Sequence, residues 1–290
     1  MTNLVKSKKG LLVWLIALIS ATSFLVLAAV INGTPGDDDI EGTPANDNIK
    51  GFAGDDVISG GGGNDIIDGG LHDDMIAGGP GNDNINGGDG NDTICGGGYD
   101  DPNTKSGCDF RSFNFPLTSD VLNGGRGNDM IFGSSGHDRL IGGSGNDTLV
   151  GGFGNDYIDG GTGNDTIDES VDCDEADEGV SGGNNTLIGG AGSDVITGGC
   201  GRDIIDPGQG LDQIDAGPGD DMIIIRPGDV PGFQTEVIVC GDGDNDTVLL
   251  YGFPRGVQIP TGTNPPVTIT DPWSRGTYLI DGSCEVIARR

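Results

Sequence analysis

The sequence has few of the residues that fill an ordinary hydrophobic core. Aromatic residues make up 5% of its 290 positions, and 14 Lys and Arg stand against 46 Asp and Glu, which gives a formal charge of −32. The negative charges of such a chain repel one another, so disorder is the default expectation. Only a regular pattern in the sequence can argue for a fold. The scarcity of basic residues argues against nucleic acid as a partner, because binding to phosphates depends on Lys and Arg. Multivalent cations are the natural counter-charge.

Motifs of enzymes are also scarce. The chain has two histidines, His72 and His137, and no HExxH motif for a catalytic zinc ion. Gly179, Ser181 and Gly183 match the GxSxG pattern of hydrolases, but the glycine-rich segment around them lacks the strand and helix that this motif requires. We therefore predict that the protein is not an enzyme. A small secreted polysaccharide-active enzyme or carbohydrate-binding accessory protein remains the alternative, because parallel β-helices can host pairs of catalytic carboxylates.

The first 31 residues differ in composition from the rest. A lysine-rich start precedes an apolar run from Leu11 to Ile31, which is the layout of a secretory signal peptide. Val26 and Ala28 have the spacing of small residues that precedes a cleavage site. The run is also long enough to span a bilayer, so residues 1–31 are either a signal peptide or an N-terminal membrane anchor. Both interpretations place the remaining chain outside the cytoplasm, in the extracellular space or at the cell surface.

The chain contains an even number of cysteines, and it is predicted to be exported. They are Cys95, Cys108, Cys173, Cys200, Cys240 and Cys284. Disulfide bonds are therefore expected. Pairing of neighbours along the chain is favoured, because each such pair brackets one irregular segment. A zinc site is the weaker alternative, since no CxxC motif is present.

A nine-residue repeat dominates the rest of the chain. Seven units run without a gap from Gly33 to Cys95, five from Gly124 to Asp168 and five from Val180 to Ile224. The sixth position of the unit is Asp in all units but one, where Asn185 stands, and the eighth is Ile or Leu throughout. Glycine prevails at the first, second and fourth positions, where it allows the positive φ of a tight turn. Repetition at a short fixed period predicts a solenoid.

Each unit is too small to bury its own aliphatic residue. Two units form one coil, and stacking coils at strand spacing aligns the eighth-position residues of alternate units. One ladder is expected to hold Ile40, Ile58, Ile76 and Ile94, and the facing ladder Ile49, Ile67 and Ile85. The sixth-position aspartates align in the same way, with about 5 Å between neighbours. The predicted fold class is therefore all-β, a parallel β-helix with rows of carboxylates in its turns.

Carboxylates at that spacing repel one another unless a cation lies between them. A hard cation converts the repulsion into attraction, and carbonyl groups of the glycine-rich turn can complete an all-oxygen shell. Ca²⁺ fits better than Mg²⁺, because it accepts six to eight oxygens in a flexible geometry. We predict that the chain binds several Ca²⁺ ions, up to about ten, and that it folds when it binds them.

Units such as GGGGNDIID, GGPGNDNIN and GGSGNDTLV resemble the GGxGxDxUx nonapeptide of the RTX, or hemolysin-type, calcium-binding repeats. The resemblance implies a right-handed parallel β-roll, in which sixth-position Asp side chains and carbonyls of the preceding glycines bind Ca²⁺ between turns. The ligands carried over to this sequence are Asp38, Asp47, Asp56, Asp65, Asp74, Asp83, Asp92, Asp129, Asp138, Asp147, Asp156, Asp165, Asp194, Asp203, Asp212 and Asp221. Ala45 and His72 replace turn glycines, which puts the sites that use those two turns in doubt. Asn185 lacks the charge, so the third block of units opens weakly.

The pattern divides the chain into three parts. Residues 1–31 form the export segment, residues 32–224 the array of repeats and residues 225–290 a β-rich C-terminal cap, because alternating apolar stretches there predict strands. Loop insertions are expected at 96–119 and 169–179, where the register breaks. These features predict an extracytoplasmic calcium-binding protein with a structural or adhesive role. A cell-surface glycan or protein is a candidate further partner, and a membrane is contacted only through an N-terminal anchor.

A few acidic residues stand outside the regular units. Asp120 resumes the register after the first loop. Asp242, Asp244 and Asp246 resemble a degenerate turn of the repeat that could hold one more ion. A disordered acidic chain remains the third interpretation, and it predicts no gain of β-structure with metal.

Overall fold

The computed structural model describes most of the repeat region and parts of the C-terminal region. The described residues are 27–97, 118–169, 183–226, 235–240, 246–251, 267–270, 277–280 and 284–289. The predicted export segment up to residue 26, most of both predicted loops, Cys108, Cys173, Asp242 and Asp244 lie outside them. The described ranges contain strands and turns, and no apolar helix of membrane-spanning length. By its contacts the chain divides into two compact units, residues 1–140 and 141–290.

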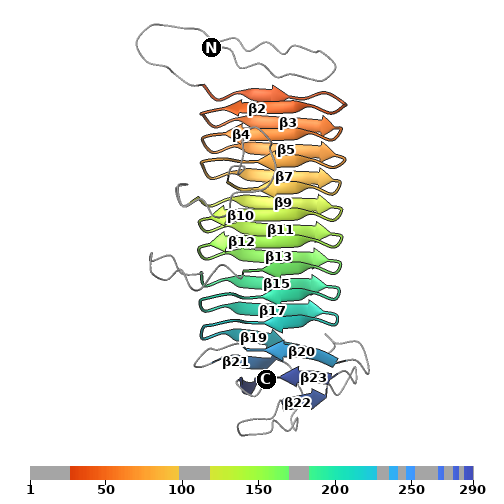
Figure 1. The fold of residues 1–290 in the computed structure, drawn as a ribbon, viewed down its shortest axis with the longest axis vertical. Coiled ribbons are helices and arrows are strands. Elements are labelled where there is room, and N and C mark those ends of the chain that lie inside the picture. The colour runs from red at the N-terminus through yellow and green to blue at the C-terminus, as the bar shows by residue number, and fades with distance from the viewer. Residues whose placement is uncertain are drawn as a thin grey trace. The chain divides into compact units, whose positions relative to one another are not determined.

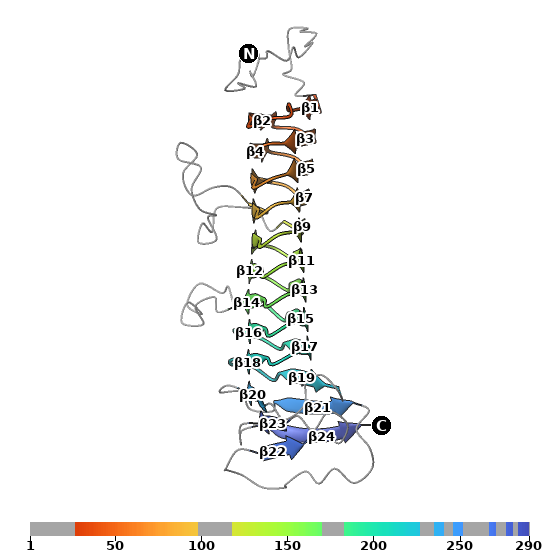
Figure 2. The ribbon, with the colours of Figure 1, turned by 90° about the vertical axis from the view of Figure 1, so that its right-hand side faces the viewer.

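In the first unit the chain alternates between two parallel sheets. One sheet holds β1 (Val30–Asn32), β3 (Asn48–Ala53), β5 (Ile66–Leu71), β7 (Asn84–Asp89) and β9 (Val121–Arg126). The other holds β2 (Asp39–Thr43), β4 (Val57–Gly61), β6 (Met75–Ala77), β8 (Thr93–Cys95) and β10 (Met130–Ser135). Strands within each sheet follow the order of the chain, and the two sheets face each other (Figures 1 and 2). Two nonapeptides therefore make one coil.

The second unit has the same construction. After β11 (Arg139–Ser144), which contains the boundary between the units, one sheet holds β13 (Tyr157–Thr162), β15 (Thr186–Ala191), β17 (Ile204–Gln209), β19 (Met222–Ile225), β21 (Thr247–Tyr251) and β24 (Glu285–Arg289). The other holds β12 (Thr148–Phe153), β14 (Thr166–Asp168), β16 (Val195–Thr197), β18 (Gln213–Asp215), β20 (Thr235–Val239), β23 (Thr277–Ile280) and β22 (Val267–Thr270). Pairing is parallel except between β22 and β23. Beyond residue 225, β20, β21, β23 and β24 thus extend the two parallel sheets, and the antiparallel β22 ends one of them.

Aliphatic ladders run through the space between the sheets. In the first unit, one ladder contains Ile40, Ile58, Ile76 and Ile94, and the other Ile49, Ile67, Ile85 and Leu122. In the second unit, the ladders contain Leu149, Ile167, Ile196, Ile214 and Ile238, and Ile158, Leu187, Ile205, Ile223 and Val248. All these side chains are at most 1% exposed. The predicted all-β parallel solenoid and its ladders are confirmed.

The turns depend on left-handed backbone conformations. At Gly163, with φ of 135°, an added β-carbon would lie 1.5 Å from the carbonyl oxygen of Gly145 in the preceding coil. Three residues other than glycine also have positive φ among the described ranges: Phe52 at 80°, His72 at 78° and Ser134 at 86°. Such conformations are unfavourable for residues with a β-carbon. These positions therefore carry strain that glycine would not.

Replacing Phe52 with Gly is expected to raise the free energy of unfolding by about 1 kcal/mol, because a β-carbon in the left-handed region costs about 1–2 kcal/mol. The Phe52 side chain is 49% exposed, so its removal sacrifices little buried surface. Thermal unfolding in saturating calcium measures the change. Phe52→Ala is the control, since it removes the ring and keeps the β-carbon. Equal stabilisation by both variants would locate the strain in the ring and not in the backbone.

Candidate metal centres

The sixth-position aspartates form hydrogen-bonded rows along the turns. The N–H group of Asp38 donates to Oδ1 of Asp56 at 2.8 Å, and the N–H group of Asp56 donates to Oδ1 of Asp74 at 2.9 Å. The same bond recurs between successive aspartates of both rows in each unit. In each of these pairs, one carboxylate oxygen of the second aspartate is thus fixed by the backbone of the preceding coil. All sixteen predicted ligands are at most 4% exposed.

The second carboxylate oxygen is buried without a hydrogen-bond donor. This holds for Oδ2 of Asp56, Asp65, Asp74, Asp83, Asp92, Asp165, Asp194, Asp203 and Asp221. A buried oxygen that carries negative charge and receives no hydrogen bond is costly. A whole row of such oxygens indicates that the turns bind a partner that the polypeptide itself does not supply.

Backbone carbonyl oxygens lie beside these orphaned oxygens. A β-carbon added to Gly51 would lie 2.4 Å from Oδ2 of Asp56 and 2.5 Å from the carbonyl oxygen of Gly69 in the next coil. A β-carbon added to Gly60 would meet Oδ2 of Asp65 at 2.5 Å and the carbonyl oxygen of Gly78 at 2.6 Å. The absence of a side chain at Gly51 and Gly60 therefore leaves room for this convergence of oxygens, because a β-carbon would fill the space between them.

Burial raises the pKa of these carboxyl groups. The pKa of Asp74 rises from its ordinary value of 3.8 to about 8 and that of Asp83 also to about 8, mainly through desolvation, with neighbouring carboxylates adding to the effect. The pKa values of Asp56 and Asp92 rise to about 6 for the same leading reason. Hydrogen bonds from the backbone N–H groups oppose the rise. Without a cation, the charged form of these carboxyl groups is therefore disfavoured at neutral pH.

The donor set fits calcium. The polar atoms that converge beside the orphaned oxygens are carboxylate and carbonyl oxygens, the ligand type that Ca²⁺ takes in flexible numbers. No group of three or more His, Cys, Asp or Glu side chains that could hold a metal occurs among the described residues. A site in the described turns therefore needs backbone carbonyls beside one or two carboxylates. This composition suits a hard cation and gives no thiolate or imidazole set for zinc.

The structure also shows what happens at the turns that depart from the repeat. In the turn that contains Ala45, the hydroxyl group of Thr43 donates to Oδ1 of Asp47 at 3.0 Å and its N–H group donates to Oδ2 at 2.5 Å. Both oxygens of Asp47 therefore have donors, unlike those of Asp56 and Asp65, whose Oδ2 atoms have none. In the turn that contains His72, Oδ2 of Asp74 remains without a donor, and His72 Nδ1 accepts the N–H group of Gly54 at 3.2 Å on the exposed side.

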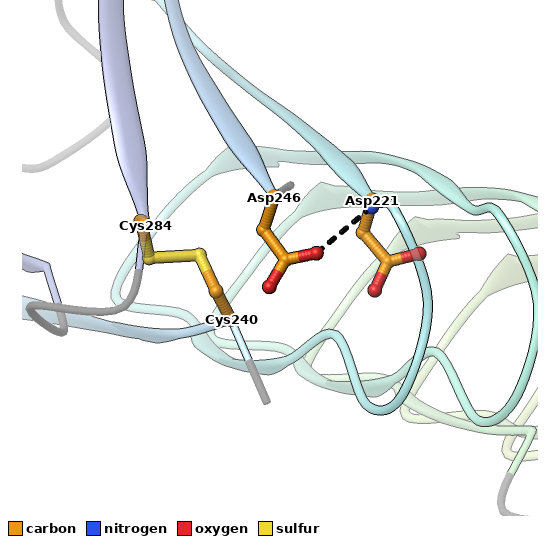
Figure 3. Close-up of a disulfide and its surroundings, with 4 residues drawn as sticks. All are labelled: Asp221, Cys240, Asp246 and Cys284. Carbon is orange, nitrogen blue, oxygen red and sulfur yellow. Dashed lines mark hydrogen bonds between the residues drawn. A yellow bond between two sulfur atoms is a disulfide. The ribbon is translucent and has the colours of Figure 1, made fainter. Parts of the chain in front are cut away.

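Two further aspartates belong to the rows although they lie outside the regular units. Asp120 accepts the N–H group of Asp83 at 2.6 Å, and its pKa is raised to about 6 by burial. Asp246 accepts the N–H group of Asp221 at 3.0 Å and lies beside the last disulfide bond (Figure 3). Both are 1% exposed. The signal for each is an Asp two residues before a buried aliphatic residue, as in the regular unit.

The cysteines follow the expected chemistry where the structure describes them. Cys240 and Cys284 form a disulfide bond, as predicted, with 5.7 Å between their Cα atoms (Figure 3). Cys95 and Cys200 are also disulfide-bonded. Their predicted partners, Cys108 and Cys173, lie outside the described residues, so those two pairings stay predictions. The disulfide at Cys240 joins the end of β20 to the start of β24, which belong to different sheets.

Comparison with known families identifies the repeat. The family model of the RTX calcium-binding nonapeptide repeat matches residues 32–67, 68–101, 118–149, 132–167 and 180–214. These segments cover more than half of the chain. Comparison with curated proteins gives no match. Calcium binding by the repeat domain follows from the family match, and the oxygen-lined turns agree with it. The chain belongs to the family of RTX calcium-binding nonapeptide repeat proteins.

Proposed function

We propose that this chain is an extracytoplasmic protein whose sixth-position aspartates hold calcium between successive turns and so fold it into a stiff β-roll with a structural or adhesive role. The observation that carries the proposal is the row of buried Oδ2 atoms without donors, most of them beside a backbone carbonyl oxygen of the next coil. Calcium supplies the positive charge and the coordination that these oxygens lack. The sixteen aspartates predicted from the repeat, together with Asp120 and Asp246, are the proposed side-chain ligands.

The proposed location follows from the sequence and from the chemistry of the fold. The lysine-rich and apolar start of the chain is suited to export, and disulfide bonds persist in oxidising surroundings outside the cytoplasm. Protease treatment of intact cells that express the full chain tests the location. Digestion of the repeat region in intact cells, or its release into the medium, is the expected result. Protection until the cells are lysed would contradict it.

The ligand assignment is tested by Asp74→Asn, with Asp73→Asn as the matched control in the same turn. Asp74 is buried, whereas Asp73 is exposed and accepts the N–H group of Asn91 at 2.8 Å. Loss of the Asp74 charge affects the turns on both sides, so the calcium concentration at the midpoint of folding should rise about tenfold. Asp73→Asn should leave the midpoint unchanged. Circular dichroism during a calcium titration measures both.

The Asn variant is a fair test, because the fold already accepts Asn at this position. Asn185 takes the place of a sixth-position aspartate, and its Oδ1 accepts the N–H group of Asp156 at 2.9 Å. Asp74→Asn therefore keeps the hydrogen bond within the row and removes the charge. Equal midpoints for the two variants would show that the buried aspartates are not ligands.

The adhesive role is tested separately with glycan arrays and calcium-loaded protein. Binding that saturates and exceeds what calcium bridging to acidic sugars explains would favour the carbohydrate-directed alternative. Stiffening of the chain by calcium without such glycan binding supports the structural role.

A further inference from the structure

Glu169 occupies a place that most other coils give to glycine. It lies one coil after Gly151, whose N–H group donates to Glu169 Oε1, and its own N–H group donates to the carbonyl oxygen of Thr197 at 3.0 Å. The residue is 1% exposed. The sequence pattern assigned it to a loop, but the backbone pairing places it at the first position of a turn. The residues that follow it, 170–182, lie outside the described ranges, which resume at Gly183.

The Glu169 side chain points into the row of oxygens. A β-carbon added to Gly151 would lie 2.7 Å from Oδ2 of Asp156, and 2.8 and 2.9 Å from Oε1 and Oε2 of Glu169. Glu169 Oε2 is buried and receives no hydrogen bond. At Gly51 the corresponding neighbour is the carbonyl oxygen of Gly69, so here a carboxylate takes the position of a carbonyl.

The same turn is the one that lacks a carboxylate at its sixth position. Asn185 stands there, between Asp156 and Asp203 in the row, and its N–H group donates to Oδ1 of Asp203 at 2.7 Å. The amide continues the hydrogen-bonded row and contributes no charge. Glu169 brings a carboxyl group to this turn from a different position of the repeat.

We propose that Glu169 is a calcium ligand that replaces the carboxylate missing at Asn185, so that the turn of Asn185 holds an ion beside Asp156. This proposal rests on the proposed function of the aspartate rows. A buried residue that served only to accept the N–H group of Gly151 would do so as Gln, without the penalty of burying a charge. The unpartnered Oε2 beside Asp156 is the observation that a structural role leaves unexplained.

Counting bound calcium on the full chain tests the proposal. Glu169→Gln keeps an oxygen that can accept the Gly151 N–H group and removes the charge. Equilibrium dialysis against calcium, with the protein-bound metal measured by atomic emission, should find one ion fewer per chain than in the wild type. The double variant Glu169→Gln, Asn185→Asp moves the charge to the usual position and should regain that ion. Glu41→Gln, at an exposed position of β2, is the control and should keep the wild-type count.

The outcomes separate this proposal from the one on which it rests. A Glu169→Gln variant with the wild-type count overturns the role of Glu169, and so does a double variant that does not regain the ion. Loss of several ions together with β-structure would show that Glu169 acts in folding and would also overturn the proposal. A wild-type chain that binds no calcium would instead refute the proposed function of the aspartate rows, whatever the variants do.

Discussion

Removal of calcium with EDTA at neutral pH is expected to abolish most of the β-structure of the repeat region. In most coils each sheet buries one large aliphatic residue, such as Ile58 and Ile67, and this is a small core for the length of chain that it orders. At the same time each coil buries carboxylates whose second oxygen has no donor. Without a cation the small core must therefore hold together rows of like charges.

Far-UV circular dichroism and light scattering measure the transition. Addition of Ca²⁺ in excess of the chelator should restore β-structure and compaction cooperatively, whereas Mg²⁺ at the same concentration should not, because it demands a tighter octahedral shell. The experiment is run with disulfide bonds intact, and then with a reductant present. A β-signal that survives EDTA with intact disulfides and disappears only on reduction would show that covalent links, and not calcium, hold the fold.

Acidification in EDTA is expected to restore the fold that removal of calcium abolishes. The pKa of Asp74 is raised to about 8 in the folded chain, and those of Asp65 and Asp165 to about 7, from an ordinary value of 3.8. Groups with a raised pKa bind protons more tightly when the chain is folded. Their contribution to stability is therefore fully present below about pH 4 and is lost as the pH rises through the range of about 6 to 8.

With calcium present the dependence should reverse, because a proton and a calcium ion compete for the same carboxylate. Circular dichroism against pH, recorded once in EDTA and once in calcium, should give two curves of opposite slope. High salt serves as the control for exposed charges, whose repulsion it screens much more than that of buried groups. If the transition in EDTA vanishes in high salt, net surface charge and not the buried rows accounts for it.

Much of this architecture can be predicted from residue spacing. A fixed period with one aliphatic residue per unit allows one register, which is why Ile40, Ile58 and Ile76 align as expected. The same spacing places the sixth-position aspartates in rows. The carbonyl oxygens beside them, such as that of Gly69, are set by the backbone and leave no signature of their own beyond the glycine that makes room.

Residues next to insertions are harder to predict. Counting in nines placed Val180 at the start of a unit, whereas the backbone pairing gives that place to Glu169. Residues can be inserted in a turn because the pairing of the strands on either side does not depend on the length of the turn. Asp120 follows the same logic, since it joins its row 37 residues after Asp83. The donors that Thr43 supplies to Asp47 are likewise a local feature with no periodic signal.

The disulfide bond between Cys240 and Cys284 has a consequence for the order of unfolding within the second unit. Coils that contact only their neighbours unfold one after another. Unfolding begins at an end, where the last coil has a neighbour on one side alone. This bond ties the last coils of the unit across both sheets, so thermal fraying cannot begin there. Asp221 and Asp246, which lie beside it, should therefore be among the last residues of the unit to release their ions as calcium becomes scarce (Figure 3).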